Sequence, residues 1–141
     1  TWCSSSSRVR SFFFDFGKGM TLLERIEKKN YTLDMALKWM LQITLAMHYM
    51  HERNHILRDI KPENVFIDEK DDAKLGDLGT ISTRLATRSG MGSEGYIAPE
   101  VIKAADDDKG EIFYDGRANI WSLGMIFGEL LTGKRLPNKS I

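Results

Sequence analysis

The sequence predicts a mainly α-helical α+β domain, and two features of its hydrophobic pattern carry that prediction. Apolar residues recur every three or four positions near 33–50 and again near 120–130, as expected for two buried helices. Between them, the runs Val65–Ile67 and Ala73–Leu75 flank a polar turn, which indicates two short strands. With 141 residues and 42% hydrophobic content, the chain has the size and composition of one compact domain.

The first long helix is expected to begin after Thr32, a plausible N-cap, with Asp34 facing the positive end of the helix. A shorter helix is expected to start at Thr21, because Thr21 and Glu24 have capping-box spacing, and to end near Asn30. The buried stripe predicted for the long helix comprises Leu33, Leu37, Met40, Thr44 and Met47, widened by Ala36, Ile43 and Met50.

The second long helix has a predicted stripe of Ile120, Leu123, Ile126, Phe127 and Leu130, and Gly133 and Pro137 stop it. Residues 77–100 lack a steady period and predict a long loop, which in a compact domain is usually functional. The aromatic run 11–16 predicts a buried strand that ends at a turn containing Gly17.

Charge and cysteine content exclude several classes of protein. Lys+Arg and Asp+Glu balance at 20 each, so no basic surplus indicates a nucleic acid or an anionic membrane as partner. The single cysteine, Cys3, excludes an internal disulfide. No apolar run reaches the roughly 18 residues that a membrane span requires. We therefore expect no nucleic-acid partner, no membrane span, and an intracellular, cytoplasmic location.

Four polar residues stand out as a group suited to phosphoryl transfer: Asp59, Lys61, Asn64 and Asp77. This chemistry requires divalent cations that neutralise phosphate charge, a positive group on the phosphoryl and an acceptor for the hydroxyl proton. Mg²⁺ prefers hard oxygen ligands such as carboxylates and amide oxygens.

The motifs around these residues resemble those of eukaryotic-type serine/threonine protein kinases. Residues 57–64, Leu-Arg-Asp-Ile-Lys-Pro-Glu-Asn, are similar to the catalytic loop, and Asp77-Leu78-Gly79 to the metal-binding loop. Ala98-Pro99-Glu100 resembles the end of the activation segment, which would span 77–100. Residues 114–131 resemble the central helix of the large lobe, and the helix itself is expected at about 116–132. The resemblance implies a small-lobe strand and hinge over 1–17 and a partial large lobe over 18–141.

The resemblance also implies a role for each matched residue. Asp59 is expected to accept or orient the substrate hydroxyl proton, Lys61 to contact the γ-phosphate of ATP, and Asn64 and Asp77 to hold magnesium. Phe14, Asp15 and Gly17 at the hinge, with Leu22, Val65, Phe66 and Ile67, are expected around the adenine. Ser93 is expected to bridge Asp59 and Lys61, and Glu94, Gly95 and Tyr96 to shape the site for a protein substrate with a Ser or Thr acceptor.

The sequence also offers candidate residues for regulation and for metal binding outside this site. Arg58 suggests control by phosphorylation of the activation segment, because a phosphate there can pair with its guanidinium. Ser89 is the first candidate for the modified residue and Thr87 the second. The alternative is that both are unmodified hydroxyls in a solvated loop. The run 51–55 matches the H-E-x-x-H zinc pattern, yet a helix end is expected inside it and no third ligand is evident. Asp106–Asp108 lacks the ligand spacing of a calcium loop.

Two departures and one gap keep alternatives open. Leu57 stands where these kinases usually have histidine, and Asn119 stands where an aspartate usually accepts hydrogen bonds from the catalytic loop, so we expect weakened activity. The resemblance covers about half of a kinase domain, without a Gly-rich loop or the small-lobe lysine, so we expect this chain by itself to be inactive. A pseudokinase-type scaffold and an inactive fragment are the alternatives to an enzyme.

Overall fold

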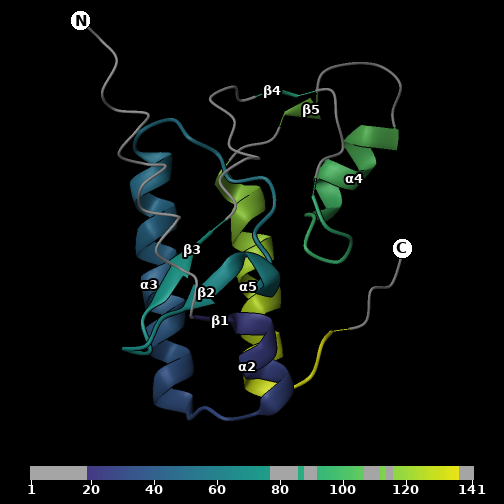
Figure 1. Cartoon of the computed structure of the whole chain (residues 1–141). Helices are drawn as coiled ribbons and strands as arrows, with labels where there is room; N and C mark the ends of the chain where they lie inside the picture. Colours follow the sequence, from purple (N-terminus) through teal and green to yellow (C-terminus); the bar gives the residue numbers. More distant parts are fainter. Residues whose placement is uncertain (1–18, 77–85, 88–91, 107–111, 114–115, 137–141) are drawn as a thin grey trace, which may run out of the picture.

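The computed structural model describes residues 19–76, 86–87, 92–106, 112–113 and 116–136, and two long helices form its frame (Figure 1). Helix α3 (Leu33–His51) and helix α5 (Gly116–Thr132) run side by side, with a small sheet and helix α2 (Leu22–Lys28) packed near them. The remaining elements are β1 (Met20–Thr21), a 3₁₀ turn η1 (Pro62–Asn64), β2 (Val65–Ile67), β3 (Ala73–Leu75), β4 (Ala86–Thr87), α4 (Pro99–Asp106) and β5 (Ile112–Phe113). The predicted mainly helical α+β class is confirmed.

The predicted hairpin is present, and a third strand extends its sheet. Strand β2 pairs with β3 in antiparallel register, Phe66 opposite Lys74, and β1 pairs with the other edge of β2. Asp68 holds the turn between β2 and β3, since one carboxylate oxygen accepts the Lys70 and Asp72 amides and the other pairs with the Lys74 ammonium. These hydrogen bonds and the Lys74 charge lower the pKa of Asp68 to about 2 against a smaller opposing effect of burial.

Both predicted helix starts are confirmed. The Thr21 hydroxyl accepts the Glu24 amide and the Glu24 carboxylate accepts the Thr21 amide, so both halves of a capping box form. The Thr32 hydroxyl likewise accepts the Met35 amide at the start of α3. Helix α2 ends at Lys28, two residues before the expected end, where Lys29 takes a left-handed conformation at the C-cap.

The buried face of α3 differs from the predicted stripe. The stripe was wrong at Leu33, Leu37 and Thr44, which are exposed; the side chains that face the core are Ala36, Trp39, Ile43 and Met47. Trp39 rotates the face, because its indole N–H donates to the carbonyl of Asp71 in the β2–β3 turn. Leu33, Leu37, Leu41, Leu45 and Tyr49 instead form an apolar stripe at the surface, each about half exposed.

Helix α5 also buries a face that hydrophobic spacing predicted only in part. Ile126 and Leu130 are buried, whereas Ile120 is exposed and that part of the prediction was wrong. Three polar side chains, Asn119, Ser122 and Glu129, occupy the buried face instead. Gly133 ends the helix, as predicted, at a positive φ of 61°.

The main core lies between α2, α3, α5 and the sheet, and includes Leu57, Ile60 and Tyr96 from the loops. A smaller cluster of Ile56, Ala98, Val101 and Ala118 lies under α4. Helix α4 and the antiparallel β4–β5 pair were not predicted; β4 and the start of α4 fall inside the expected 77–100 loop. The predicted strand at 11–16 lies outside the described residues.

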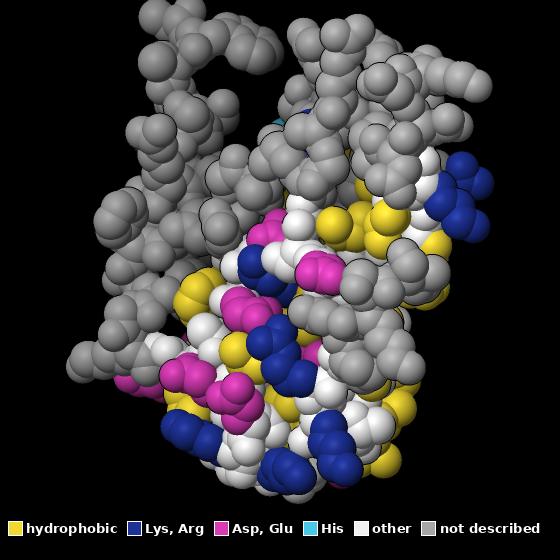
Figure 2. All heavy atoms as spheres, turned by 90° about the vertical axis from the view of Figure 1, so that its right-hand side faces the viewer, with side chains coloured by type: hydrophobic (Ala, Val, Ile, Leu, Met, Phe, Trp, Pro, Cys, Tyr) yellow, Lys and Arg dark blue, Asp and Glu magenta, His cyan; other side chains and the backbone are white. Residues whose placement is uncertain are grey.

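The described surface carries mixed charge. Figure 2 shows Lys and Arg side chains interspersed with Asp and Glu over one face, consistent with the balanced composition. Among the described residues, no helix combines the length and apolar character needed to cross a bilayer.

Candidate active site

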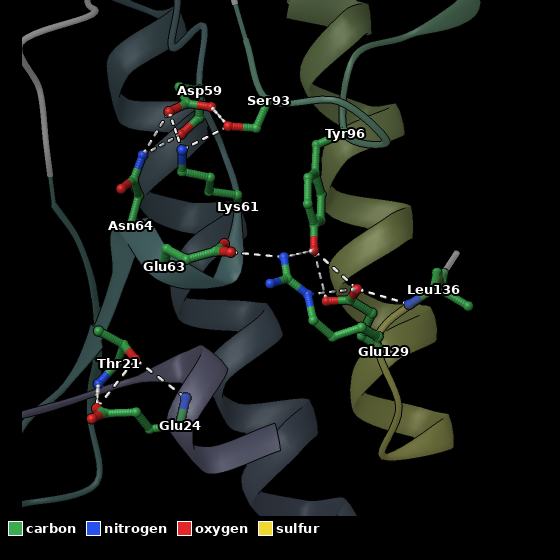
Figure 3. A network of polar contacts seen from close by, with 11 residues as sticks. Thr21, Glu24, Asp59, Lys61, Glu63, Asn64, Ser93, Tyr96, Glu129 and Leu136 are labelled. Carbon is green, nitrogen blue, oxygen red and sulfur yellow. Dashed lines mark hydrogen bonds and ion pairs between the residues drawn. The ribbon is translucent and has the colours of Figure 1, made fainter. Parts of the chain in front are cut away.

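Three side chains converge on the carboxylate of Asp59 (Figure 3). The Ser93 hydroxyl donates to Asp59 Oδ1 at 2.7 Å, and the Lys61 ammonium pairs with Oδ2 at 2.8 Å. The Asn64 amide donates to Oδ2 at 3.1 Å and to the Asp59 main-chain carbonyl at 2.9 Å. Lys61 Nζ also donates to Ser93 Oγ at 2.6 Å, so Asp59, Lys61 and Ser93 form a closed triangle.

The triangle keeps Asp59 ionised. Partial burial acts to raise the pKa of its carboxyl, but hydrogen bonds from Lys61, Ser93 and Asn64 and the charge of Lys61 outweigh burial and lower the pKa. The Asp59 side chain stays 15% exposed. A carboxylate that is charged at neutral pH and reachable from solvent can accept a proton or a hydrogen bond from an incoming hydroxyl group.

The local fold fixes Asn64 within this group. It ends η1, where its amide N–H donates to the Lys61 carbonyl, and its own carbonyl accepts the Gly76 amide at 2.7 Å. Gly76 leaves room for the Phe66 ring, because a Cβ at this position would lie 2.2 Å from that ring and would force it to move. Asp77 follows Gly76 in the sequence and lies outside the described residues.

A second glycine brings Ser93 to Asp59. Gly92 has a φ of +144°, and a Cβ on it would lie 2.8 Å from the Ile97 side chain and 3.1 Å from the Arg58 carbonyl. After it, the Tyr96 amide donates to the Ser93 carbonyl, and Gly95, at a φ of +88°, completes the turn. The close approach that only glycine allows carries the segment onto the catalytic loop.

Asn119 ties the loop 57–64 to α5 with a bond that was not predicted. Its side-chain N–H donates to the carbonyl of Leu57, and its Oδ1 lies 2.9 Å from Nε2 of His51. The sequence predicted an acceptor at this position, and the contact with Leu57 uses the amide as a donor. An aspartate, which has no N–H, cannot make that bond when ionised.

A second polar network lies behind the site and was not predicted. The Tyr96 hydroxyl donates to the buried Glu129 carboxylate and lies 2.9 Å from each of its oxygens. The Ser122 hydroxyl donates to the main-chain carbonyl of Tyr96. Burial raises the pKa of Tyr96; the hydrogen bond from Arg135 opposes this, and the Glu129 carboxylate adds to the rise. The sequence signal available was that Glu129 is the one acidic residue of α5.

The structure places the other expected residues unevenly. Leu22, Val65 and Ile67 are buried in the main core, and Phe66 is partly exposed. Their place around the adenine stays a prediction. Glu94 is exposed beside Ser93, and Arg58 is partly buried beside Asp59. Thr87 lies in β4, opposite Ile112 of β5 in the antiparallel pair. Phe14, Asp15, Gly17, Asp77 and Ser89 lie outside the described residues.

The zinc pattern at 51–55 does not form a continuous helical site. Helix α3 ends at His51, Glu52 is its C-cap, and His51 faces Asn119. In the described part of the chain, no group of three or more His, Cys, Asp or Glu side chains is placed to hold a metal ion. The expected helix end inside the pattern is confirmed.

The comparison with known families agrees with this geometry. The family described as "Protein kinase domain" matches residues 2–140. The chain belongs to this family. It is 32% identical over 136 residues to CBL-interacting serine/threonine-protein kinase 20 of Arabidopsis thaliana, and 36% identical over 136 residues to CBL-interacting serine/threonine-protein kinase 5 of the same plant. It is also similar to the serine/threonine-protein kinase Genghis Khan of Drosophila melanogaster, at 33% over 127 residues.

These kinases are much longer than the matched region. The alignments cover 91% of the chain for both plant relatives but 29% of each relative, and 84% of the chain but 7% of the fly kinase. The chain therefore spans less than a third of the length of each of these relatives.

Proposed function

We propose that the protein transfers the γ-phosphate of ATP to Ser or Thr hydroxyl groups of protein substrates. The observation that carries the proposal is the convergence of Lys61, Asn64 and Ser93 on Asp59. Membership of the protein kinase domain family and relatives named as serine/threonine kinases support the reaction class.

Asp59 takes the role of proton acceptor. Among the described residues Ser93 is the donor to its Oδ1, and a carboxylate oxygen has two lone pairs, so a substrate hydroxyl can occupy the second. As the hydroxyl oxygen bonds to the γ-phosphorus, the bond to the ADP oxygen breaks, and the hydroxyl proton passes to Asp59. Its lowered pKa keeps the carboxylate free to receive that proton at neutral pH.

Lys61 and Asn64 supply charge and orientation. The Lys61 ammonium lies between Asp59 and Ser93 and places a fixed positive charge where the phosphoryl arrives. Asn64 uses its N–H₂ group on Asp59, so its amide oxygen is left for a cation, as Figure 3 shows. This donor, with the Asp77 carboxylate next along from Gly76, fits the oxygen ligands of Mg²⁺. Mg²⁺ bound there would neutralise phosphate charge.

The test is transfer of labelled phosphate from ATP to a mixed Ser, Thr and Tyr peptide library by the purified full-length protein. We expect label on Ser and Thr, and a loss of about 10²–10⁴-fold in kcat for Asp59→Asn, the usual share of a general base. Glu69→Gln, an exposed acid in the β2–β3 turn, serves as the matched control. Equal turnover by Asp59→Asn and the unsubstituted protein would refute the proposal. Nucleotide binding without any turnover would favour the scaffold alternative.

A further inference from the structure

One guanidinium connects the two chain segments that supply Asn64 and Ser93 to the site. Arg135, three residues after α5, donates from Nη2 to Glu63 Oε1 at 2.7 Å and to the Tyr96 hydroxyl oxygen at 3.3 Å. Its Nε lies 3.9 Å from Glu129 Oε1. Glu63 directly precedes Asn64 in η1, and Tyr96 follows Ser93 by three residues, so Arg135 spans both segments.

The buried end of this network makes the link stiffer than a surface ion pair. Glu129 is 1% exposed, and a buried carboxylate is stable only with several partners. Besides Tyr96 it accepts the amide N–H of Leu136 at 2.9 Å, which fixes the backbone immediately after Arg135 (Figure 3). This bond restrains the main chain next to Arg135, and therefore also the position from which its side chain extends to Glu63.

Glu63 depends on this arginine. One of its carboxylate oxygens pairs with Arg135, and the other is buried with no hydrogen-bond partner among the described residues. An exposed ion pair contributes little by itself, but Glu63 is only 33% exposed and lies in a turn whose next residue contacts Asp59. Loss of the arginine leaves this half-buried carboxylate without a counter-charge.

We propose that Arg135 is a positioning residue that sets the η1 turn against the Ser93–Tyr96 segment, and thereby aligns Asn64 and Ser93 on Asp59. The inference rests on the proposed function, because its consequence for turnover requires Asp59 to be the catalytic acceptor. Arginine suits the task, since its planar fork presents separate N–H groups to Glu63 and to the Tyr96–Glu129 pair, whereas a lysine ammonium is a single point.

The kinetic test compares variants of the purified full-length protein with saturating peptide. We expect Arg135→Ala to lower kcat about tenfold while the KM for ATP changes by less than about twofold, and Arg135→Lys to recover part of the loss. Lys134→Ala, an exposed neighbour of equal charge, is the control and should match the unsubstituted protein. Glu63→Gln should resemble Arg135→Ala, and the double variant should be no worse than either. Additive losses in the double variant would overturn the proposal.

A second measurement separates positioning from general loss of stability and does not depend on activity. Hydrogen exchange should quicken in Arg135→Ala at the amides of Asn64 and Tyr96, which bond to Lys61 and Ser93, while amides in the middle of α3 keep their rates. Equal acceleration in α3 would mean a merely structural role and would reject the proposal. If the unsubstituted protein shows no Asp59-dependent turnover, the proposed function fails, and the exchange pattern alone decides whether Arg135 aligns the two segments.

Discussion

Lys61 affects the protonation of Asp59 and, in the proposed function, also contacts the reacting phosphoryl group. Removal of the ammonium removes a hydrogen bond and a positive charge that both lower the pKa of the Asp59 carboxyl, while burial still acts to raise it. In Lys61→Ala the pKa of Asp59 must therefore rise. We expect the acidic limb of the kcat/KM profile to move to higher pH, in addition to a lower plateau.

The measurement is the pH profile of peptide phosphorylation for Lys61→Ala and Lys61→Arg. Lys61→Arg retains a cation and should keep the limb near its original position even where its plateau is reduced. Because the hydrogen bonds and charge around Asp59 lower the pKa of its carboxyl in the unsubstituted protein, that protein should show no acidic limb from Asp59 near neutral pH. An acidic limb in Lys61→Ala that coincides with that of the unsubstituted protein would contradict the account.

Asn119 gives a prediction that opposes the one drawn from resemblance alone. An aspartate at this position would turn an ionised oxygen toward the Leu57 carbonyl that now accepts an N–H, inside a fully buried setting. We expect Asn119→Asp to reduce the free energy of unfolding by about 1–3 kcal/mol at about pH 8, the usual consequence of a buried unpaired polar group. Urea denaturation measures this difference.

The pH dependence distinguishes this cause from simple loss of a contact. At about pH 5 the deficit of Asn119→Asp should shrink, because a protonated carboxyl can donate to the Leu57 carbonyl. Asn119→Ala has no such donor and should show no such recovery. An Asn119→Asp variant more stable than the unsubstituted protein at pH 8 would restore the expectation that a carboxylate is preferred here.

Helix α3 shows how the choice of face follows from packing. Ile43 is 1% exposed in the main core, while Leu41, two residues earlier, is 60% exposed. We expect Ile43→Ala to lower the free energy of unfolding by about 2–5 kcal/mol, and Leu41→Ala to change it by less than about 0.5 kcal/mol. Chemical denaturation of both variants tests the assignment, and similar losses at the two positions would show that Leu41 is also covered.

Local signals predicted the elements whose determinants are close in sequence. The capping box at Thr21 and Glu24, the cap at Thr32 and the hairpin 65–75 each depend on residues a few positions apart, and each formed. The rotation of α3 depends on Trp39 reaching Asp71, a contact between residues 32 positions apart that periodicity does not contain. Helix α4 was missed because it has only eight residues, too few to show a sustained apolar period.

The candidate site divides in the same way. Asp59, Lys61 and Asn64 lie within six residues, so their spacing identified them, and the resemblance supplied Ser93 from a distant segment. Glu129 and Arg135 matter through contacts with Tyr96 and Glu63, which lie at least 33 positions away. Such charge pairs form only after the helices pack, and no pattern in one sequence marks them.

The described part of the molecule contains two apolar clusters that meet beside the loop 57–64. Ile56 belongs to the small cluster with Ala98 and Val101, while Leu57 and Ile60 belong to the main core. The division between the two clusters therefore falls between Ile56 and Leu57, just before Asp59. A substitution in either cluster would loosen the packing on a different side of the site. The loop can then lose order on its α4 side without global unfolding.

This arrangement predicts different outcomes for substitutions of equal type in the two clusters. We expect Ile126→Ala, in the main core, to lower the global free energy of unfolding by about 2–5 kcal/mol and to quicken hydrogen exchange throughout α3 and α5. Val101→Ala should quicken exchange mainly between Ala98 and Lys103, with a smaller effect on the global value. Leu131→Ala, on the exposed side of α5, is the control. If Val101→Ala instead quickened exchange in α3 as much as in α4, the two clusters would form one cooperative unit, and the loop at Asp59 would order and disorder only with the whole domain.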